Sequence, residues 1–148
     1  MTAAAGPEGY ELSTDPARVD RDLVHRFLRD ESYWARGISR EVVDRCIENS
    51  LCFGVYRGPE QVAFARVVTD RAAIAYLGDV FVVQAHRGRG LGKWLVETVM
   101  ADPDLQGLRR FLLGTADAHS LYERFGFRPL ANPGRMMEIA RPYEGPEE

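Results

Sequence analysis

In the stretch Val80-Phe81-Val82-Val83-Gln84-Ala85-His86-Arg87-Gly88-Arg89-Gly90-Leu91-Gly92-Lys93, three glycines at alternate positions separate a β-branched apolar run from an amphipathic helix. Glycine lets the backbone adopt unusual angles and approach a ligand without a clash from a Cβ atom. The first N–H groups of the helix have no intrahelical partner, and together with the helix dipole they favour an anion such as a diphosphate. The stretch therefore predicts a strand, an anion-binding loop and a helix.

Two better-known phosphate-binding loops do not match this stretch. The NTPase loop needs Ser or Thr after Gly-Lys, but Trp94 follows Gly92 and Lys93, and Arg87 stands at the first glycine position. The dinucleotide fingerprint fails because Lys93 occupies its last glycine position. The pattern that does match is Arg-x-x-Gly-x-Gly, formed by Arg87, Gly90 and Gly92.

Outward from the loop, apolar periodicity and turn residues predict an α+β order of elements. Helices are expected at residues 16–30, 39–49, 91–100 and 118–125. Strands are expected at residues 10–13, 51–57, 61–69, 72–83, 110–113, 127–130 and 136–139. The chain ends, 1–9 and 141–148, are rich in small residues, Gly and Pro, and are expected to be loose.

Length and composition indicate one soluble globular domain over residues 1–148. The net charge of -3 gives no broad attraction to nucleic acid or an anionic membrane, and no apolar run is long enough to span a bilayer. Cys46 and Cys52 lack the spacing of metal ligands, so no metal site is predicted. Free thiols favour a reducing, cytoplasmic location.

A second motif, Leu121-Tyr122-Glu123-Arg124-Phe125-Gly126-Phe127, lies downstream of the glycine-rich loop. With the loop and the order of elements, it resembles the GNAT family of N-acetyltransferases over roughly residues 10–139. The resemblance implies a mixed, mostly antiparallel sheet of about six to seven strands, flanked by about four helices and splayed at the CoA site. It also implies an acyltransferase that passes an acetyl group from acetyl-CoA to a primary amine of a small molecule or peptide by direct attack on the thioester. Dimers are usual in the family, so a homodimer is a further expectation.

The same resemblance assigns a cofactor site. Backbone N–H groups of the strand before the loop face the pantetheine arm and the thioester, with Val83 expected closest to the thioester. Thr115 stands where many relatives carry Asn, and its hydroxyl can still bond a pantetheine amide. The expected cofactor-binding residues are Phe81, Val82, Val83, Arg87, Gly88, Arg89, Gly90, Leu91, Gly92, Lys93 and Thr115.

Acyl transfer needs a neutral amine, a stabilised oxyanion and a proton for the leaving thiolate. Tyr122 is the candidate general acid by resemblance, and the alternative is an aromatic anchor for its helix. Asp79 is the candidate base or an attractor of an ammonium group, and an ordinary salt-bridged carboxylate is the alternative. His119, one helical turn before Tyr122, has two interpretations: a catalytic group, since histidine titrates near neutrality, or a residue at the helix start with no catalytic role, which is favoured.

The acceptor side is less constrained by the sequence. Tyr33, Trp34 and Phe64 are expected to line it, although large aromatic side chains usually fill the core. Arg66 and Asp70 are further candidates for acceptor contacts, and the sequence does not decide whether either takes part. Two rival functions stay open: a non-catalytic module that binds or senses acyl-CoA, and a phosphate-binding protein of another fold.

Overall fold

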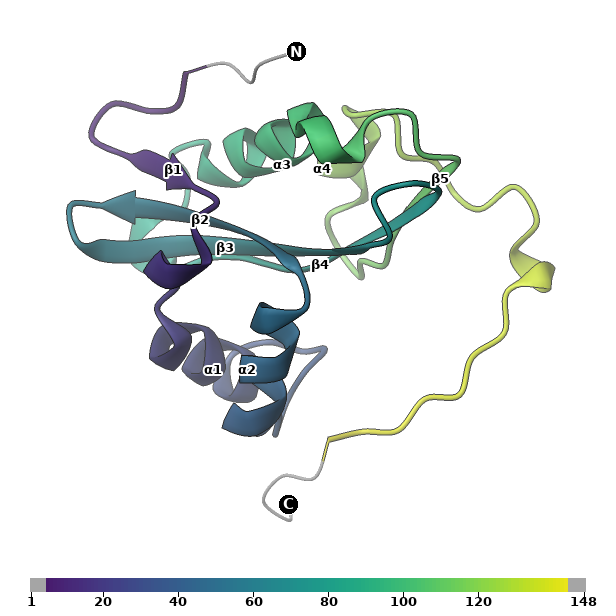
Figure 1. The fold of residues 1–148 in the computed structure, drawn as a ribbon, viewed down its shortest axis with the longest axis horizontal. Helices are drawn as coiled ribbons and strands as arrows, with labels where there is room; N and C mark the ends of the chain where they lie inside the picture. Colours follow the sequence, from purple (N-terminus) through teal and green to yellow (C-terminus); the bar gives the residue numbers. More distant parts are fainter. Residues whose placement is uncertain (1–4, 144–148) are drawn as a thin grey trace.

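The computed structural model describes residues 5–143, and its centre is a five-stranded sheet in the order β1-β2-β3-β4-β5 (Figure 1). All neighbouring strands are antiparallel except β4 and β5, which are parallel. The strands are β1 Glu11–Ser13, β2 Leu51–Arg57, β3 Glu60–Thr69, β4 Ile74–Val82 and β5 Arg110–Leu113. A parallel pair needs a crossover connection, usually a helix, to bring the chain back to the same end of the sheet. Between β4 and β5, α3 makes this connection.

Helices cover both faces of the sheet: α1 and α2 lie on one side and α3 and α4 on the other (Figure 1). They span α1 Arg21–Asp30, α2 Arg40–Glu48, α3 Leu91–Ala101 and α4 His119–Glu123, with short 3-10 turns η1 Pro16–Arg18, η2 Gln84–His86, η3 Pro103–Leu105 and η4 Pro133–Arg135. The side chain of Asp20 accepts the Leu23 N–H at the start of α1, and Ser39 accepts the Val42 N–H at the start of α2. Because Asp20 caps the helix, α1 begins later than the predicted position 16.

Apolar side chains form one core cluster on each face of the sheet. The cluster under α1 and α2 contains Phe27, Phe64 and Phe81, and the Phe27 and Phe81 rings stack with centroids 4.0 Å apart. The cluster under α3 contains Leu91, Leu95 and the inward residues of β2 and β3. Close packing in the two clusters holds α3 against one face of the sheet, and α1 and α2 against the other.

A β-bulge interrupts β4 in its second half. Asp79 and Val80 of β4 stand opposite the single residue Ala65 of β3, and Asp79 has a positive φ of 54°. Beyond the bulge, β4 also loses its other neighbour, because β5 pairs only with Ile74–Leu77. The two parallel strands therefore diverge from Gly78 onward, as the family resemblance predicts.

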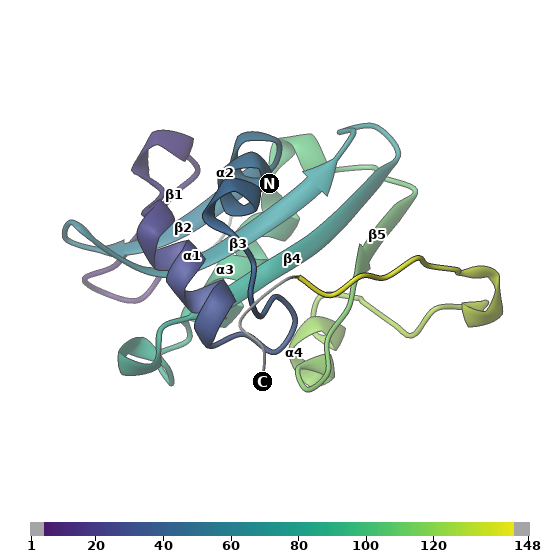
Figure 2. The ribbon, with the colours of Figure 1, turned by 90° about the horizontal axis from the view of Figure 1, so that it is seen from below.

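The sheet has five strands, so the predicted number of six to seven is too high, although the predicted mixed, mostly antiparallel sheet is confirmed. Neither 127–130 nor 136–139 forms a strand. Pro129 cannot donate a ladder hydrogen bond, and Phe127 turns inward to pack on the Tyr122 ring. After η4 the chain runs away from the outer edge of β5 and back toward the side of α1 and α2 (yellow in Figures 1 and 2). Met137 and Ile139 remain 95% and 82% exposed. The predicted loose ends fall partly outside residues 5–143.

The stacked ring of Phe27 makes the packing of α1 testable. Phe27→Ala should lower the free energy of unfolding by about 3–5 kcal/mol, because it removes a buried ring from a packed cluster. Val68→Ala, at an exposed position of β3, is the control and should change it by no more than about 0.5 kcal/mol. Urea denaturation measures both, and a loss below about 1 kcal/mol for Phe27→Ala would contradict this account of the core.

Candidate active site

A cleft of about 560 Å³ lies where β4 and β5 diverge. Its walls come from the α1–α2 loop, the bulge of β4, the segment between β5 and α4, α4 itself and the C-terminal stretch. The structure brings together five residues that the sequence singled out for three different roles: Tyr33, Trp34, Asp79, Thr115 and Tyr122. Their convergence from four separate elements makes this cleft the candidate active site.

Asp79 is held by two partners inside the cleft. Its Oδ2 accepts a hydrogen bond from Arg66 Nε at 2.8 Å, and its Oδ1 accepts one from Trp34 Nε1 at 2.8 Å. Arg66 also donates to the Ser50 hydroxyl at 3.1 Å. Burial opposes the charge on Arg66, but the Asp79 carboxylate outweighs it and raises the pKa of the guanidinium. Both carboxylate oxygens of Asp79 are thus already engaged, which is the arrangement of a positioning group.

Tyr122 is buried in α4 with its ring edge-on to Phe127, at a centroid distance of 6.0 Å. Burial raises the pKa of its phenol above the ordinary value, and the neighbouring Tyr33 and Asp117 raise it further. The hydroxyl has no hydrogen-bond partner within residues 5–143, so it is available to a ligand in the cleft. A phenol in this setting carries its proton throughout the neutral pH range.

The glycine-rich loop has the geometry of an anion site. Gly88 and Gly90 have φ of 79° and 80°, and the left-handed Gly90 stands at the N-cap of α3. No side chain caps this helix, and its first turn contains no acidic residue. The N–H groups of the first turn, from Leu91 to Lys93, are therefore left for an external acceptor.

The backbone of Val83, which was expected closest to the thioester, is engaged within the protein. The N–H of Val83 donates to Val62 O of β3 at 2.9 Å, so it is used within the sheet. Neighbouring residues of a strand direct their N–H and C=O groups to opposite edges. Val82 therefore faces the edge that β5 leaves open, and its carbonyl oxygen accepts a hydrogen bond from Arg87 Nε at 2.9 Å. Arg87 thus braces the loop against β4, while Arg89 and Lys93 remain exposed.

Three of the expected residues do not present their side chains to a ligand. Phe64, expected at the acceptor site, is fully buried under α1 and α2 because its ring fills the core beside Phe81. The side chains of Phe81 and Leu91 are buried as well, so only their backbones can take part. Thr115 accepts the Ala118 N–H at 3.0 Å, which orients the start of α4 and leaves its hydroxyl proton to donate.

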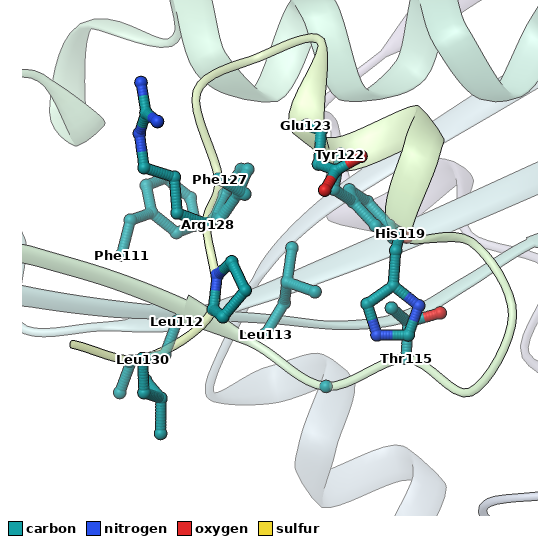
Figure 3. Close-up of a pocket in the computed structure, with 12 residues that line it drawn as sticks. Phe111, Leu112, Leu113, Thr115, His119, Tyr122, Glu123, Phe127, Arg128 and Leu130 are labelled. Carbon is teal, nitrogen blue, oxygen red and sulfur yellow. The ribbon is translucent and has the colours of Figure 1, made fainter. Parts of the chain in front are cut away.

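Next to the cleft, a groove of about 280 Å³ runs along β5 (Figure 3). His119 and Thr115 lie at one end of it, and Phe111, Arg128 and Leu130 lie at the other (Figure 3). Tyr122 and Thr115 line both the groove and the cleft. The face of α4 therefore separates two cavities, and Tyr122 can be reached from either.

Two aromatic residues that line the cleft, Tyr76 and Tyr143, were not predicted as site residues. Tyr76 is exposed on β4, and in the sequence it is one of several residues that favour a strand. Tyr143 belongs to the C-terminal stretch that was expected to be loose, and it returns to the cleft. Neither position has a motif around it, so only the folded arrangement reveals them.

The comparisons with known proteins agree with this geometry. Residues 24–127 match the model of the acetyltransferase (GNAT) family. The chain belongs to the GNAT family of acetyltransferases. A protein of Gibberella zeae named "Putative acetyltransferase FG08082" is 33% identical over 135 residues, which cover 76% of this chain and 75% of the relative.

Solved structures extend the comparison. A GNAT-family acetyltransferase structure from Xanthomonas campestris pv. campestris has 52% identity and a TM-score of 0.90, covering 93% of this chain and 96% of that one. A Clostridium acetobutylicum acetyltransferase solved with acetyl-CoA has a TM-score of 0.66 at 14% identity, covering 88% and 94%, and so shares the fold. By family, this protein is an acetyltransferase, and the family uses acetyl-CoA.

The described part of the chain, residues 5–143, contains no helix long and apolar enough to cross a membrane. The same residues contain no cluster of three or more His, Cys, Asp or Glu side chains that could hold a metal ion.

The left-handed Gly90 gives a test of the loop. Gly90→Ala should lower the free energy of unfolding by about 1–2 kcal/mol, because a Cβ atom disfavours this backbone conformation although nothing lies within 4 Å of it. Gly92→Ala is the matched control: its Cβ would meet only Val82 Cγ2 at 3.9 Å, an ordinary contact. Equal losses in the two variants, measured by urea denaturation without ligand, would show that the conformation at Gly90 carries no strain penalty.

Proposed function

We propose that this protein transfers an acetyl group from acetyl-CoA to a primary amine of a small molecule or peptide by direct attack on the thioester. One observation carries the proposal: the cleft holds a free phenol, Tyr122, and the edge of β4 that β5 leaves open leads from it to an uncapped helix N-terminus beside Val82. The first two suit a thioester and its leaving group, and the third suits a diphosphate.

The donor half of the reaction uses mostly backbone groups. The first turn of α3 binds the diphosphate, with Gly88 and Gly90 allowing close approach and Arg89 and Lys93 adding positive charge. The open edge of β4 at Val82 supplies an N–H group to the pantetheine arm, since the Val82 carbonyl oxygen accepts from Arg87. The Thr115 hydroxyl supplies one more donor. Leu91 and Gly92 take part through N–H groups of the first turn, and Arg87 braces the loop. The backbone of Val83 is engaged by Val62 and His86, and Phe81 supports the strand by packing in the core.

The chemistry follows from these positions. A neutral amine attacks the thioester carbonyl carbon, the C–N bond forms, and the C–S bond breaks to release CoA. The departing thiolate takes a proton from Tyr122, and the nitrogen loses its proton to solvent. Asp79 acts as a positioning residue rather than as the base, because one oxygen holds the Trp34 indole and the other holds Arg66.

The alternative function is a non-catalytic module that binds or senses acyl-CoA. A pure binding module would need the loop and the open strand edge but no proton donor beside the thioester. The buried phenol of Tyr122, with its raised pKa and free hydroxyl, favours the enzyme.

Tyr122→Phe tests the enzyme against the sensor. The variant should lower the rate of amine-dependent thiol release from acetyl-CoA by about 100-fold or more, because it removes a general acid. The affinity for CoA should change little, because the ring and its packing on Phe127 are kept. Calorimetry with CoA and a thiol-detecting assay with a panel of amines measure the two effects. Wild-type turnover in Tyr122→Phe would remove Tyr122 from the mechanism.

A cytoplasmic location is part of the proposal. Cys46 and Cys52 are both free thiols, and burial raises the pKa of Cys52 to about 11. A protein with unpaired cysteines and an acetyl-CoA substrate suits a reducing compartment. With a net charge of -3 and no metal cluster among residues 5–143, acetyl-CoA and the amine are the proposed partners.

A homodimer is also proposed, and the C-terminal stretch supports it. Within residues 5–143 the outer edge of β5 has no strand partner, and the groove beside it is lined by apolar side chains such as Phe111, Leu113 and Phe127. The strand-like residues 136–139 extend away from that edge with Met137 and Ile139 exposed. A second copy can satisfy both surfaces at once if each chain lays residues 136–139 along the β5 edge of the other.

Light scattering tests the exchange. The wild-type chain should have the mass of a dimer, and the double variant Met137→Asp, Ile139→Asp should have the mass of a monomer, because two charges cannot be buried along β5. Val68→Asp, on β3 at an exposed position, is the control and should remain dimeric. A wild-type chain with the mass of a monomer would overturn the proposed dimer. This includes a monomer in which residues 136–139 pair with β5 of the same chain.

A further inference from the structure

The exposed aromatic side chains of this protein gather in one place. Within residues 5–143, only four Phe, Tyr or Trp side chains are more than a third exposed: Tyr33 at 56%, Trp34 at 41%, Tyr76 at 47% and Tyr143 at 42%. All four line the cleft. The other rings of the described residues are buried or partly buried. Exposed rings that are concentrated in one concave surface are typical of a ligand site.

The protein holds two of these rings by their polar atoms. The Tyr33 hydroxyl accepts the Ala116 N–H at 2.8 Å, and the Trp34 indole N–H donates to Asp79. The two rings also meet edge to face, with centroids 4.9 Å apart. Because their polar groups have partners within the protein, these side chains offer a ligand mainly ring surface.

Tyr76 reaches across the open end of the sheet. Its hydroxyl lies 3.6 Å from the position that a Cβ of Gly114 would take, and its ring lies 3.3 Å from that of Gly78. A Cβ at Gly78 would crowd the ring, whereas one at Gly114 would make an ordinary contact with the hydroxyl. Tyr76 thus lies close to the point where the strands diverge, beside the proposed thioester position.

The charges in the cleft exclude an anionic acceptor. Arg66 is the one cationic side chain among the described residues that line it, and it is already bonded to Asp79 and Ser50. Asp117 also lines the cleft, and its carboxylate has no ion pair within residues 5–143. An ammonium group finds a carboxylate and ring faces here, whereas a phosphate or carboxylate finds no available cation.

We propose that the acceptor is an amine carried on an aromatic, uncharged body, cationic in solution, with its body held by Tyr33, Trp34 and Tyr76. This inference rests on the proposed function and names the class of its acceptor. The ammonium loses one proton to solvent to become the nucleophile. On attack the nitrogen loses its second proton, the amide C–N bond replaces the thioester C–S bond, and CoA leaves as the thiol.

The test compares amines in the thiol-release assay. Phenethylamine and tryptamine represent the proposed class; glucosamine 6-phosphate and a peptide beginning with two glutamates represent anionic acceptors. The aromatic amines should give kcat/KM at least about tenfold higher, since ring contacts and cation–π attraction favour them. Preference for either anionic acceptor would overturn this inference and leave the proposed function standing.

Variants at Tyr76 sharpen the test. Tyr76→Ala should raise KM for phenethylamine about tenfold with a smaller change in kcat, because ring contact is present in both ground and transition states. Tyr76→Phe keeps the ring and should behave as wild type, and calorimetry should show equal acetyl-CoA affinity in both variants. An unchanged KM in Tyr76→Ala would overturn the assigned ring contact.

Calorimetric titration of phenethylamine into the protein–CoA complex separates the two proposals further. If phenethylamine binds the wild-type complex and binds more weakly to Tyr76→Ala, the proposed ligand class is supported. If such binding occurs without turnover, only the proposed function fails. Absence of both binding and turnover with the aromatic amines overturns the acceptor class.

Discussion

The hydrogen-bonded ion pair between Arg66 and Asp79 is the constraint on which the site depends. Asp79 adopts a positive φ that a non-glycine residue rarely takes, and such a conformation persists only where its surroundings hold it. Arg66 on the neighbouring strand and Trp34 from the α1–α2 loop do so. The bulge they stabilise lies where β4 and β5 part, so one partly buried ion pair links a local backbone distortion to the opening of the sheet.

The remaining parts of the site are consequences of that opening. Because β4 and β5 are parallel, their C-terminal ends point in the same direction. The start of α3, which follows β4, therefore lies on the same side of the sheet as the end of β5, and the gap between the two strands runs between them. In the proposed reaction, backbone groups serve the cofactor that is common to the family, while side chains from loops serve the variable acceptor. This division explains why the donor half of the site is easier to recognise than the acceptor half.

The elements that depend on local sequence patterns could be predicted from the sequence. The glycine-rich loop, the capped helices and the first five strands follow from periodicity and turn residues, and Tyr122 lies in the cleft where its motif indicated. The exact backbone contact was not predictable, because the register that engages Val83 with β3 depends on the bulge at Asp79. Phe64 was misplaced because period-2 alternation does not say which face of a doubly covered strand points at a ligand. The final two strands failed because pairing depends on a partner edge that the local sequence does not encode.

The hydrogen bond from the Ala116 N–H to the Tyr33 hydroxyl joins segments 83 residues apart in the chain. An insertion or deletion in either the α1–α2 loop or the β5–α4 segment would separate these two atoms. The relative position of the two segments therefore depends on the length of each. Changes of acceptor in this lineage are then expected through single substitutions at ring positions such as Trp34 and Tyr76, with the loop architecture inherited intact.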